Sequence, residues 1–118
     1  MKKLILLLLI TANVFIACNS SRNLSTIQPK TGIIEITAKS EFRMWKDIKH
    51  PSFDVVLTNS SATQSCEVYY VKSSGTEKWI SPSLQANSSK TITIPKDGHL
   101  FLKNFNPNTL TINYKIND

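Results

Sequence analysis

The side chains best suited to chemistry are two histidines, an internal cysteine and an internal methionine, which together are the ligand types of a copper site. They are His50, His99, Cys66 and Met44. In such sites the cysteine, the second histidine and the methionine share one loop, whereas Cys66 precedes His99 by 33 residues. The sequence therefore predicts no metal site, and we expect both histidines at the surface or its rim.

No other group of side chains forms a catalytic pattern. The serines occur in turn-forming clusters such as NSSATQS (59–65), without the G-x-S-x-G context of a nucleophilic serine. The eight carboxylates are dispersed, and the sequence does not select an acid and base pair among them. Three glycines are too few for a glycine-rich phosphate loop. We therefore expect a protein without enzymatic activity, catalytic residues or cofactor.

The segment that ends at Cys18 has the layout of a secretory signal peptide. Two lysines precede an apolar run at 4–10, and a shorter apolar run at 14–17 leads to Cys18. A permanent membrane span needs about 20 consecutive apolar residues, and the polar residues at 11 and 13 interrupt this one. The pattern favours removal of the segment over its retention as a membrane helix.

The last residues of this segment, Phe15, Ile16, Ala17 and Cys18, resemble the lipobox of bacterial lipoproteins. Phe15 stands where leucine is most often found, and the resemblance covers the signal segment alone. It implies that residues 1–17 are cleaved off and that the thiol of Cys18 carries a diacylglycerol with further acyl chains such as palmitate. Each buried methylene contributes about 0.8 kcal/mol, so two or three chains would anchor the protein permanently.

The residues after Cys18 predict a flexible tether over 18–30, because NSSRNLSTIQPK is polar and without apolar periodicity. A dozen such residues span roughly 20 Å, which keeps the following domain close to its membrane. Asn19 is not the aspartate linked with inner-membrane retention, and the acidic run linked with surface export is absent from this sequence. By the lipoprotein resemblance, we expect the periplasmic face of an outer membrane.

Cys66 has no partner for an internal disulfide if Cys18 is lipidated, although the compartment is oxidising. We therefore expect Cys66 to be buried. The alternative is a disulfide between Cys18 and Cys66, which requires that lipidation fails.

The charge pattern argues against nucleic acid as a partner. Without the two lysines of the signal segment, twelve basic residues remain against eight acidic ones. They are scattered, with acidic residues between them, and form no Lys/Arg-rich run. A solvated surface explains the excess, and attraction to anionic headgroups or acidic polysaccharide is the alternative.

From residue 31 onward, short runs of β-branched and aromatic residues alternate with Ser, Asn, Gly and Pro, which is typical of strands. The pattern predicts an all-β domain over 31–118, an antiparallel β-sandwich of immunoglobulin-like kind with about seven strands. A small barrel is the alternative. Strands are expected within 32–39, 41–51 (with an irregular connection before Pro51), 53–59, 65–72, 76–80, 90–95, 99–104 and 109–116.

Two hairpins and one tight turn connect the predicted strands. The runs 53–59 and 65–72 each place alternate apolar residues on one face, and residues 59–63 would turn between them. A second hairpin is predicted around Ser73, Ser74 and Gly75, and the PKDG sequence at 95–98 predicts a tight turn.

The candidate binding residues are aromatic. Tyr69 and Tyr70 are adjacent on a strand and so point to opposite faces, which leaves one of them in solvent. Trp45 and Trp79 are each flanked by a lysine, and each could instead be a core residue. The candidate surface comprises Tyr69, Lys78, Trp79 and Trp45.

These observations predict a non-enzymatic envelope lipoprotein that binds another protein, as an accessory subunit, an inhibitor or an immunity factor. Exposed aromatic rings or a free sheet edge would provide the contact. The alternative is a polysaccharide-binding module that stacks its aromatic rings on sugars.

Overall fold

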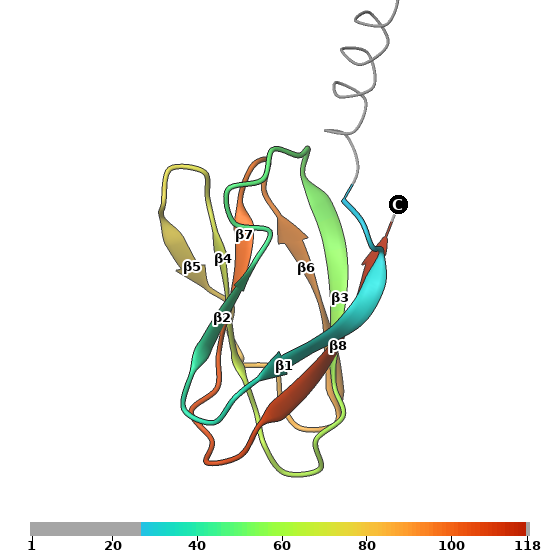
Figure 1. The fold of residues 1–118 in the computed structure, drawn as a ribbon, viewed down its shortest axis with the longest axis vertical. Helices are drawn as coiled ribbons and strands as arrows, with labels where there is room; N and C mark the ends of the chain where they lie inside the picture. Colours follow the sequence, from blue (N-terminus) through green and yellow to red (C-terminus); the bar gives the residue numbers. More distant parts are fainter. Residues whose placement is uncertain (1–26, 118) are drawn as a thin grey trace, which may run out of the picture.

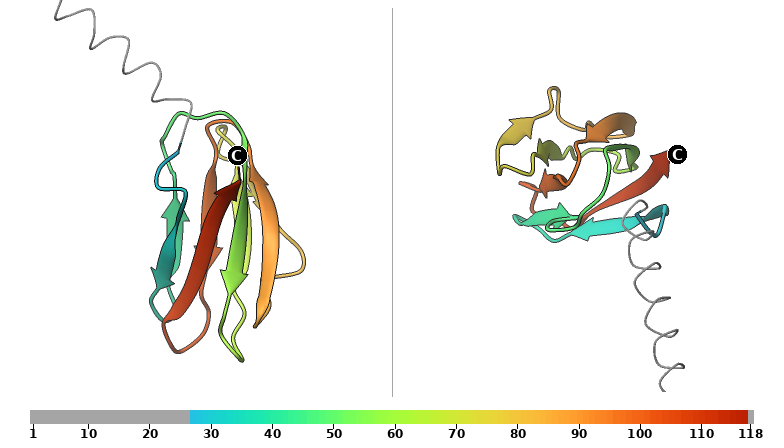
Figure 2. Two further views of the ribbon diagram at one scale, coloured as in Figure 1. Left: turned by 90° about the vertical axis from the view of Figure 1, so that its right-hand side faces the viewer. Right: turned by 90° about the horizontal axis from the view of Figure 1, so that it is seen from above.

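The computed structural model describes residues 27–117, and within this range the chain forms eight β-strands and no helix. Two four-stranded antiparallel sheets, β1-β8-β3-β6 and β2-β7-β4-β5, pack face to face (Figure 1, Figure 2). The strands are β1 (Thr31–Ile36), β2 (Glu41–Met44), β3 (Phe53–Asn59), β4 (Glu67–Val71), β5 (Glu77–Trp79), β6 (Ser88–Ile94), β7 (His99–Lys103) and β8 (Leu110–Asn117).

The core lies between the sheets because most strands alternate apolar and polar residues. In β8, the odd and even positions separate cleanly, so that Leu110, Ile112, Tyr114 and Ile116 are buried. β7 differs, since its residues from His99 to Leu102 are buried on both faces of the sheet. Something must therefore cover the outer face of β7.

The strand order is that of a jelly roll. Strands pair in a nested pattern, β1 with β8, β2 with β7, β3 with β6 and β4 with β5, and the pairs are divided between the two sheets. The predicted antiparallel β-sandwich is confirmed. The turn spacing predicted about seven strands in an immunoglobulin-like order, whereas the structure has eight strands in a different order. Turn spacing does not show which sheet the next strand joins.

The predicted hairpin between 53–59 and 65–72 is wrong. β3 pairs with β6 and β8 in one sheet, while β4 pairs with β5 and β7 in the other. Both strands bury their apolar residues in the same core, but from opposite sides. The second predicted hairpin is confirmed by the pairing of β4 with β5, and the predicted tight turn by a hydrogen bond from the Gly98 amide to the Pro95 carbonyl (2.9 Å).

The first described residues are fastened to the end of the sandwich. The Tyr114 hydroxyl donates to the Pro29 carbonyl (3.2 Å), and the Ile116 amide donates to the Lys30 carbonyl (2.7 Å). The ring of Tyr114 requires glycine opposite it, because a Cβ on Gly32 would lie 2.7 Å from a Tyr114 ring carbon. The domain thus includes residues 27–30, which the sequence assigned to the tether.

The signal segment and Cys18 lie outside the described residues. Among residues 27–117, no helix is long and apolar enough to cross a membrane.

Candidate functional site: an aromatic face

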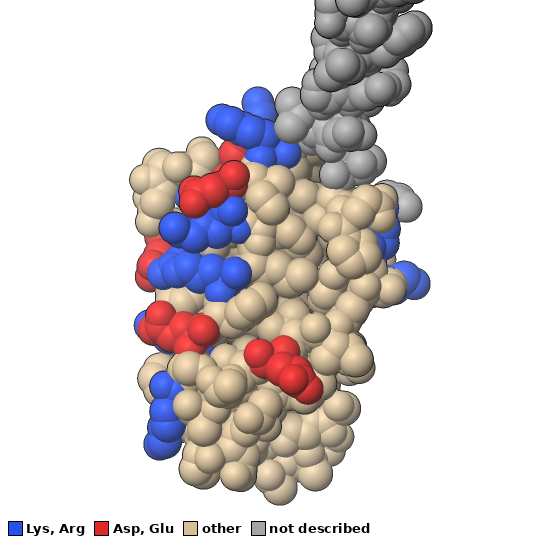
Figure 3. All heavy atoms as spheres, viewed as in Figure 1, with Lys and Arg blue, Asp and Glu red and all other residues tan. Residues whose placement is uncertain are grey.

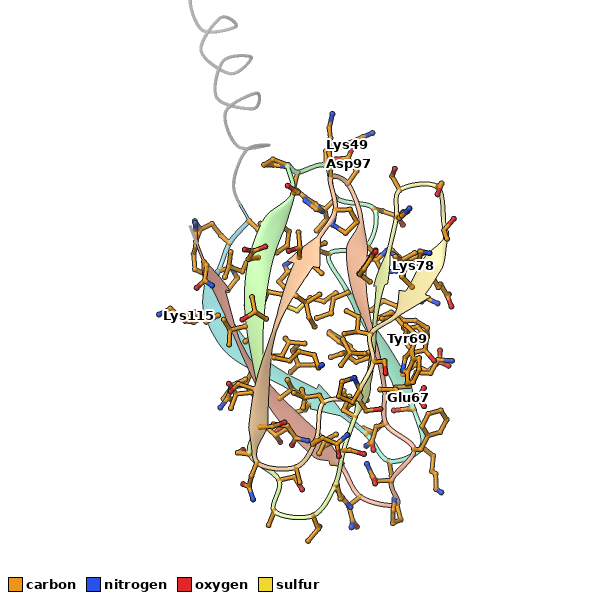
Figure 4. All side chains as sticks on the ribbon, turned by 180° about the vertical axis from the view of Figure 1, so that it is seen from behind. Lys49, Glu67, Tyr69, Lys78, Asp97 and Lys115 are labelled. Atoms are coloured by element: carbon orange, nitrogen blue, oxygen red, sulfur yellow. The ribbon has the colours of Figure 1, made fainter. Side chains whose placement is uncertain are left out.

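The outer face of the sheet β2-β7-β4-β5 carries a row of large side chains. Antiparallel register places Arg43 of β2 opposite Phe101 of β7, Phe101 opposite Tyr69 of β4, and Tyr69 opposite Trp79 of β5. We call this surface the aromatic face and define it by Arg43, Glu67, Tyr69, Glu77, Trp79, His99, Phe101 and Lys103. Charged groups of both signs gather along this side of the molecule (Figure 3), and Figure 4 shows Tyr69 and Glu67 there.

Two cations cover Phe101. The Arg43 guanidinium carbon lies 3.6 Å from the centre of the Phe101 ring, and the Lys103 ammonium lies 5.2 Å from it. The Tyr69 ring is 5.3 Å away at a tilt of 37°. Phe101 is therefore only 2% exposed although it points away from the core, which explains the buried outer face of β7.

Hydrogen bonds hold the Arg43 side chain in place over the ring. Its Nη1 donates to His99 Nε2 (2.8 Å) and its Nη2 donates to Glu77 Oε2 (3.1 Å). Because arginine only donates, His99 must accept at Nε2 and is the neutral tautomer protonated at Nδ1. Burial, with the Arg43 charge as the second cause, lowers the pKa of His99 from its ordinary value.

The Tyr69 side chain is also fixed. Its hydroxyl donates to Glu67 Oε1 (2.8 Å), and this bond raises the pKa of Tyr69. The Lys103 ammonium lies 5.0 Å from the centre of its ring. The row therefore has defined side-chain positions before any partner arrives.

Trp79 is the exposed end of the row. It is 54% exposed on the edge strand β5, beside Tyr69. It also borders an open cleft of about 460 Å³ between β5 and β6, lined with it by Tyr70, Lys72, Ile80, Thr91, Ile92, Thr93 and Pro95. A ligand could thus contact Trp79 either on the aromatic face or in the cleft.

Two of the four predicted surface residues, Tyr69 and Trp79, share the aromatic face. Lys78 is exposed but lies opposite Tyr70 in the register, on the other side of the sheet (Figure 4). Trp45 is in the core at 7% exposure, edge-on to Phe53 and Tyr114 with ring centres 5.1 and 5.7 Å apart. Its positive φ of 71° ends β2 and turns the indole inward, which its flanking lysine does not reveal.

Both histidines are buried, so their predicted surface positions are wrong. His50, 3% exposed, has its two ring nitrogens 2.7 Å from the carbonyl oxygens of Pro51 and Gly98. His99 is 8% exposed and bonded to Arg43. Each ring thus has at least one polar partner within the protein. Within residues 27–117, no three His, Cys, Asp or Glu side chains lie close enough together to hold a metal ion.

Cys66 is buried as predicted, at 1% exposure. Burial raises the pKa of its thiol to about 12. The thiolate, which is the reactive form, is therefore scarce at neutral pH.

Six members of the site were not predicted from the sequence: Arg43, Glu67, Glu77, His99, Phe101 and Lys103. The alternation of HLFLK over 99–103 was a usable signal, since it places His99, Phe101 and Lys103 on one face. The pairing of β2 with β7 that brings Arg43 beside them has no local signal, because the paired residues are at least 56 positions apart in the sequence.

No protein-family model and no curated protein matches this chain. Solved structures do resemble it. PirA is 8% identical, with 78% of this chain and 97% of that chain covered and a TM-score of 0.55. The Drosophila melanogaster CENP-C cupin domain is 11% identical, with 79% and 64% covered and a TM-score of 0.50.

A third similar structure is the capsular polysaccharide assembling protein CapF from Staphylococcus aureus, 8% identical, with 80% of this chain and 26% of that chain covered and a TM-score of 0.52. This chain thus spans less than two thirds of the CENP-C and CapF chains. At such identities the likeness shows the fold alone. It agrees with the strand order, since cupins are built on a jelly roll.

Proposed function

We propose that this protein is a non-enzymatic, lipid-anchored protein of the bacterial envelope and that its aromatic face binds a partner protein. The observation that carries the proposal is the ordered row from Arg43 to Trp79 on one outer face. Trp, Tyr and Arg are the residue types that dominate binding energy in protein interfaces. Side chains already held in position lose less conformational entropy on binding.

The mixed charges around the row favour a protein over a sugar. Glu67 and Glu77 alternate with Arg43 and Lys103, a pattern that can complement another protein's surface and fix its register. Sugar stacking needs an open ring face, but the Arg43 guanidinium covers Phe101 at 3.6 Å and Lys103 lies over Tyr69. Trp79 is the one ring of the row with a largely open surface.

The second candidate is a polysaccharide-binding module, and the cleft beside Trp79 favours it. Lys72, Thr91 and Thr93 supply polar groups next to the indole, which is a suitable lining for a sugar chain. Apart from Trp79, this site would use residues outside the aromatic face. Variants can therefore separate the two candidates.

The lipid anchor at Cys18 and a position on the periplasmic face of an outer membrane are part of the proposal. They rest on the lipobox resemblance of residues 15–18. Mass spectrometry of the protein from membranes tests the anchor: a mature chain beginning at an acylated Cys18 supports it, and an unmodified Cys18 contradicts it.

Site-directed photocrosslinking in intact cells tests the binding face. A photoreactive residue replaces Tyr69 in the full chain, and the matched control replaces Ile33, which is 67% exposed on the outer face of the other sheet. We expect one protein to crosslink at position 69 and not at position 33, and Glu77→Lys to abolish the adduct. Equal adducts at both positions would contradict the proposed face.

Retention on insoluble envelope polysaccharide tests the second candidate. If Thr91→Trp, which would fill the cleft, abolishes retention while Glu77→Lys does not, the sugar-binding reading replaces the protein-binding one.

A further inference from the structure

The loops at one end of the sandwich lie at the same end as the segment by which the chain enters it (Figure 1). Because the strands are antiparallel, the starts of β1, β3, β5 and β7 and the ends of the other strands meet at this end. The connections there are 45–52, 72–76 and 95–98, and residues 27–30 join them (Figure 1). We call this end the tether end. We call the opposite end the far end; its connections are 37–40, 60–66, 80–87 and 104–109.

The two ends differ sharply in charge. The described connections of the far end contain one charged residue, Lys39, whereas those of the tether end contain four lysines and two aspartates. Lysine atoms project from this end in Figure 3, and Figure 4 shows Lys49 at its tip. The lysines of these three connections are Lys46, Lys49, Lys72 and Lys96, and Lys30 of the entry segment is a fifth lysine at this end.

Both aspartates of the tether end are engaged within the protein. Asp47 lies 3.6 Å from the Lys46 ammonium, and Asp97 Oδ1 accepts from the His50 amide (2.9 Å). Within residues 27–117, Lys49, Lys72 and Lys96 have no carboxylate within ion-pair distance. The tether end therefore presents three exposed cations in addition to the Lys46 pair.

An exposed apolar side chain stands among these lysines. Ile48 is 44% exposed, between Lys46 and Lys49 in the loop that follows β2. The loop is anchored below by buried Trp45 and turned by positive φ values at Trp45 (71°) and Asp47 (61°). The buried Trp45 and this turn thus hold residues 46–49 at the surface of the loop.

From this arrangement we infer that the tether end lies on an anionic phospholipid surface, with the lysines at the headgroups and Ile48 in the interface. This inference rests on the lipid anchor of the proposed function, since the predicted tether, shortened to residues 19–26 because 27–30 belong to the domain, would keep the entry segment within roughly 16 Å of the membrane. Lysines near such a surface are attracted to it, and their long stems let the ammonium groups reach the phosphates.

The orientation has a consequence for the aromatic face. The strands of both sheets lie along the axis that joins the tether end to the far end (Figure 2). With the tether end on the membrane, the sheet faces therefore stand upright on it. Tyr69 and Trp79 then face sideways, along the membrane, where a neighbouring envelope protein can reach them.

Spin labelling of the full-length, membrane-purified protein in vesicles tests the inference. The label is placed on Ile48→Cys at the tether end and, as the matched control, on exposed Ala62→Cys at the far end. Native Cys66 stays unlabelled because it is buried. Collision with a water-soluble nickel chelate is compared in phosphatidylcholine vesicles with and without an equal part of phosphatidylglycerol.

We expect phosphatidylglycerol to lower the collision rate at position 48 several-fold and to leave position 62 unchanged. Combined Lys49→Gln, Lys72→Gln and Lys96→Gln substitutions should remove the difference, as should high salt. Equal collision rates at position 48 in both vesicle types, or protection at position 62, would overturn the inference.

The same preparation separates this inference from the anchor itself. Label on Cys18 of the wild-type chain would show that lipidation has failed, and the anchor would be rejected whatever the collision rates. Cys18 could instead remain unlabelled while phosphatidylglycerol gives no protection at position 48. That result would reject the inference that the tether end lies on the membrane and would leave the proposed lipid anchor intact.

Discussion

The two sheets of the sandwich turn different chemistry toward solvent although both are built from alternating strands. The outer face of β1-β8-β3-β6 carries many short polar side chains among scattered aliphatic ones such as Ile33 and Val56. Some of the polar side chains bond in local pairs, such as Thr58 with Ser89 (2.9 Å) and Thr93 with Asp54 (2.7 Å). The outer face of β2-β7-β4-β5 carries aromatic rings under stacked cations. One face is hydrated surface, whereas the other has a second, external layer of packing that is suited to binding.

The largest expected effect tests whether this external layer contributes to stability. We expect Phe101→Ala to lower the free energy of unfolding by about 3 kcal/mol, because a ring that is 2% exposed is lost from between Arg43, Tyr69 and Lys103. Val56→Ala on the other outer face should cost about 1 kcal/mol. Urea denaturation measures both, and equal losses would mean that the two faces do not differ.

The next effect concerns binding rather than stability. Trp79→Ala should weaken partner binding by about 2 kcal/mol, roughly 30-fold. The free energy of unfolding of this variant should change by less than about 0.5 kcal/mol, since the indole is 54% exposed. The control is Ile33→Ala, which removes a comparably exposed side chain from the other sheet. Titration with the partner identified by crosslinking measures the affinity of both variants. An equal loss of affinity for Ile33→Ala would remove the distinction between the faces.

A smaller effect is expected at Arg43. Arg43→Lys keeps the charge but loses the planar stack on Phe101 and the two directed hydrogen bonds, and should destabilise the fold by about 1 kcal/mol. Glu77→Gln should cost less than about 0.5 kcal/mol, because the Arg43–Glu77 pair is partly exposed. If Arg43→Lys has no effect on the unfolding midpoint, the stack does not order the face.

The smallest effect is a pH dependence that only the aromatic face should show. The pKa of His99 is lowered in the folded chain from its ordinary value of 6.5, so the unfolded chain binds more protons below that value. Stability from this group is complete above pH 6.5 and is lost as the pH falls through the lowered pKa. His99→Gln should flatten this part of the stability profile, whereas an unchanged profile would place the titration elsewhere.

Local patterns predicted the strands and the adjacent pair of β4 with β5, but not the pairs of strands that are distant in the sequence. The run 53–59 matches β3 in both bounds, since its alternation is set by one buried face. Its supposed hairpin with 65–72 was wrong because the same polar turn residues serve a hairpin and a crossing between sheets. Pairing between β2 and β7, which creates the aromatic face, depends on residues distant in the sequence.

The two tryptophans show the same limit at single residues. Each is flanked by a lysine, yet Trp45 is 7% exposed and Trp79 is 54% exposed. The difference arises from the backbone, because Trp45 follows the end of β2 with a positive φ while Trp79 lies on an edge strand. Local composition contains neither fact.

The nested pairing of the strands also determines the order in which this chain can be assembled. Only β4 and β5, at the centre of the nest, are close in sequence, and each outer pair joins strands that are farther apart, until β1 meets β8. Contacts of such long sequence separation slow folding. A chain that is synthesised from its amino terminus holds β1 and β3 without their shared neighbour until residues 110–117 emerge. The first strand made is thus among the last to be paired, and the domain remains incomplete until β8 has been synthesised.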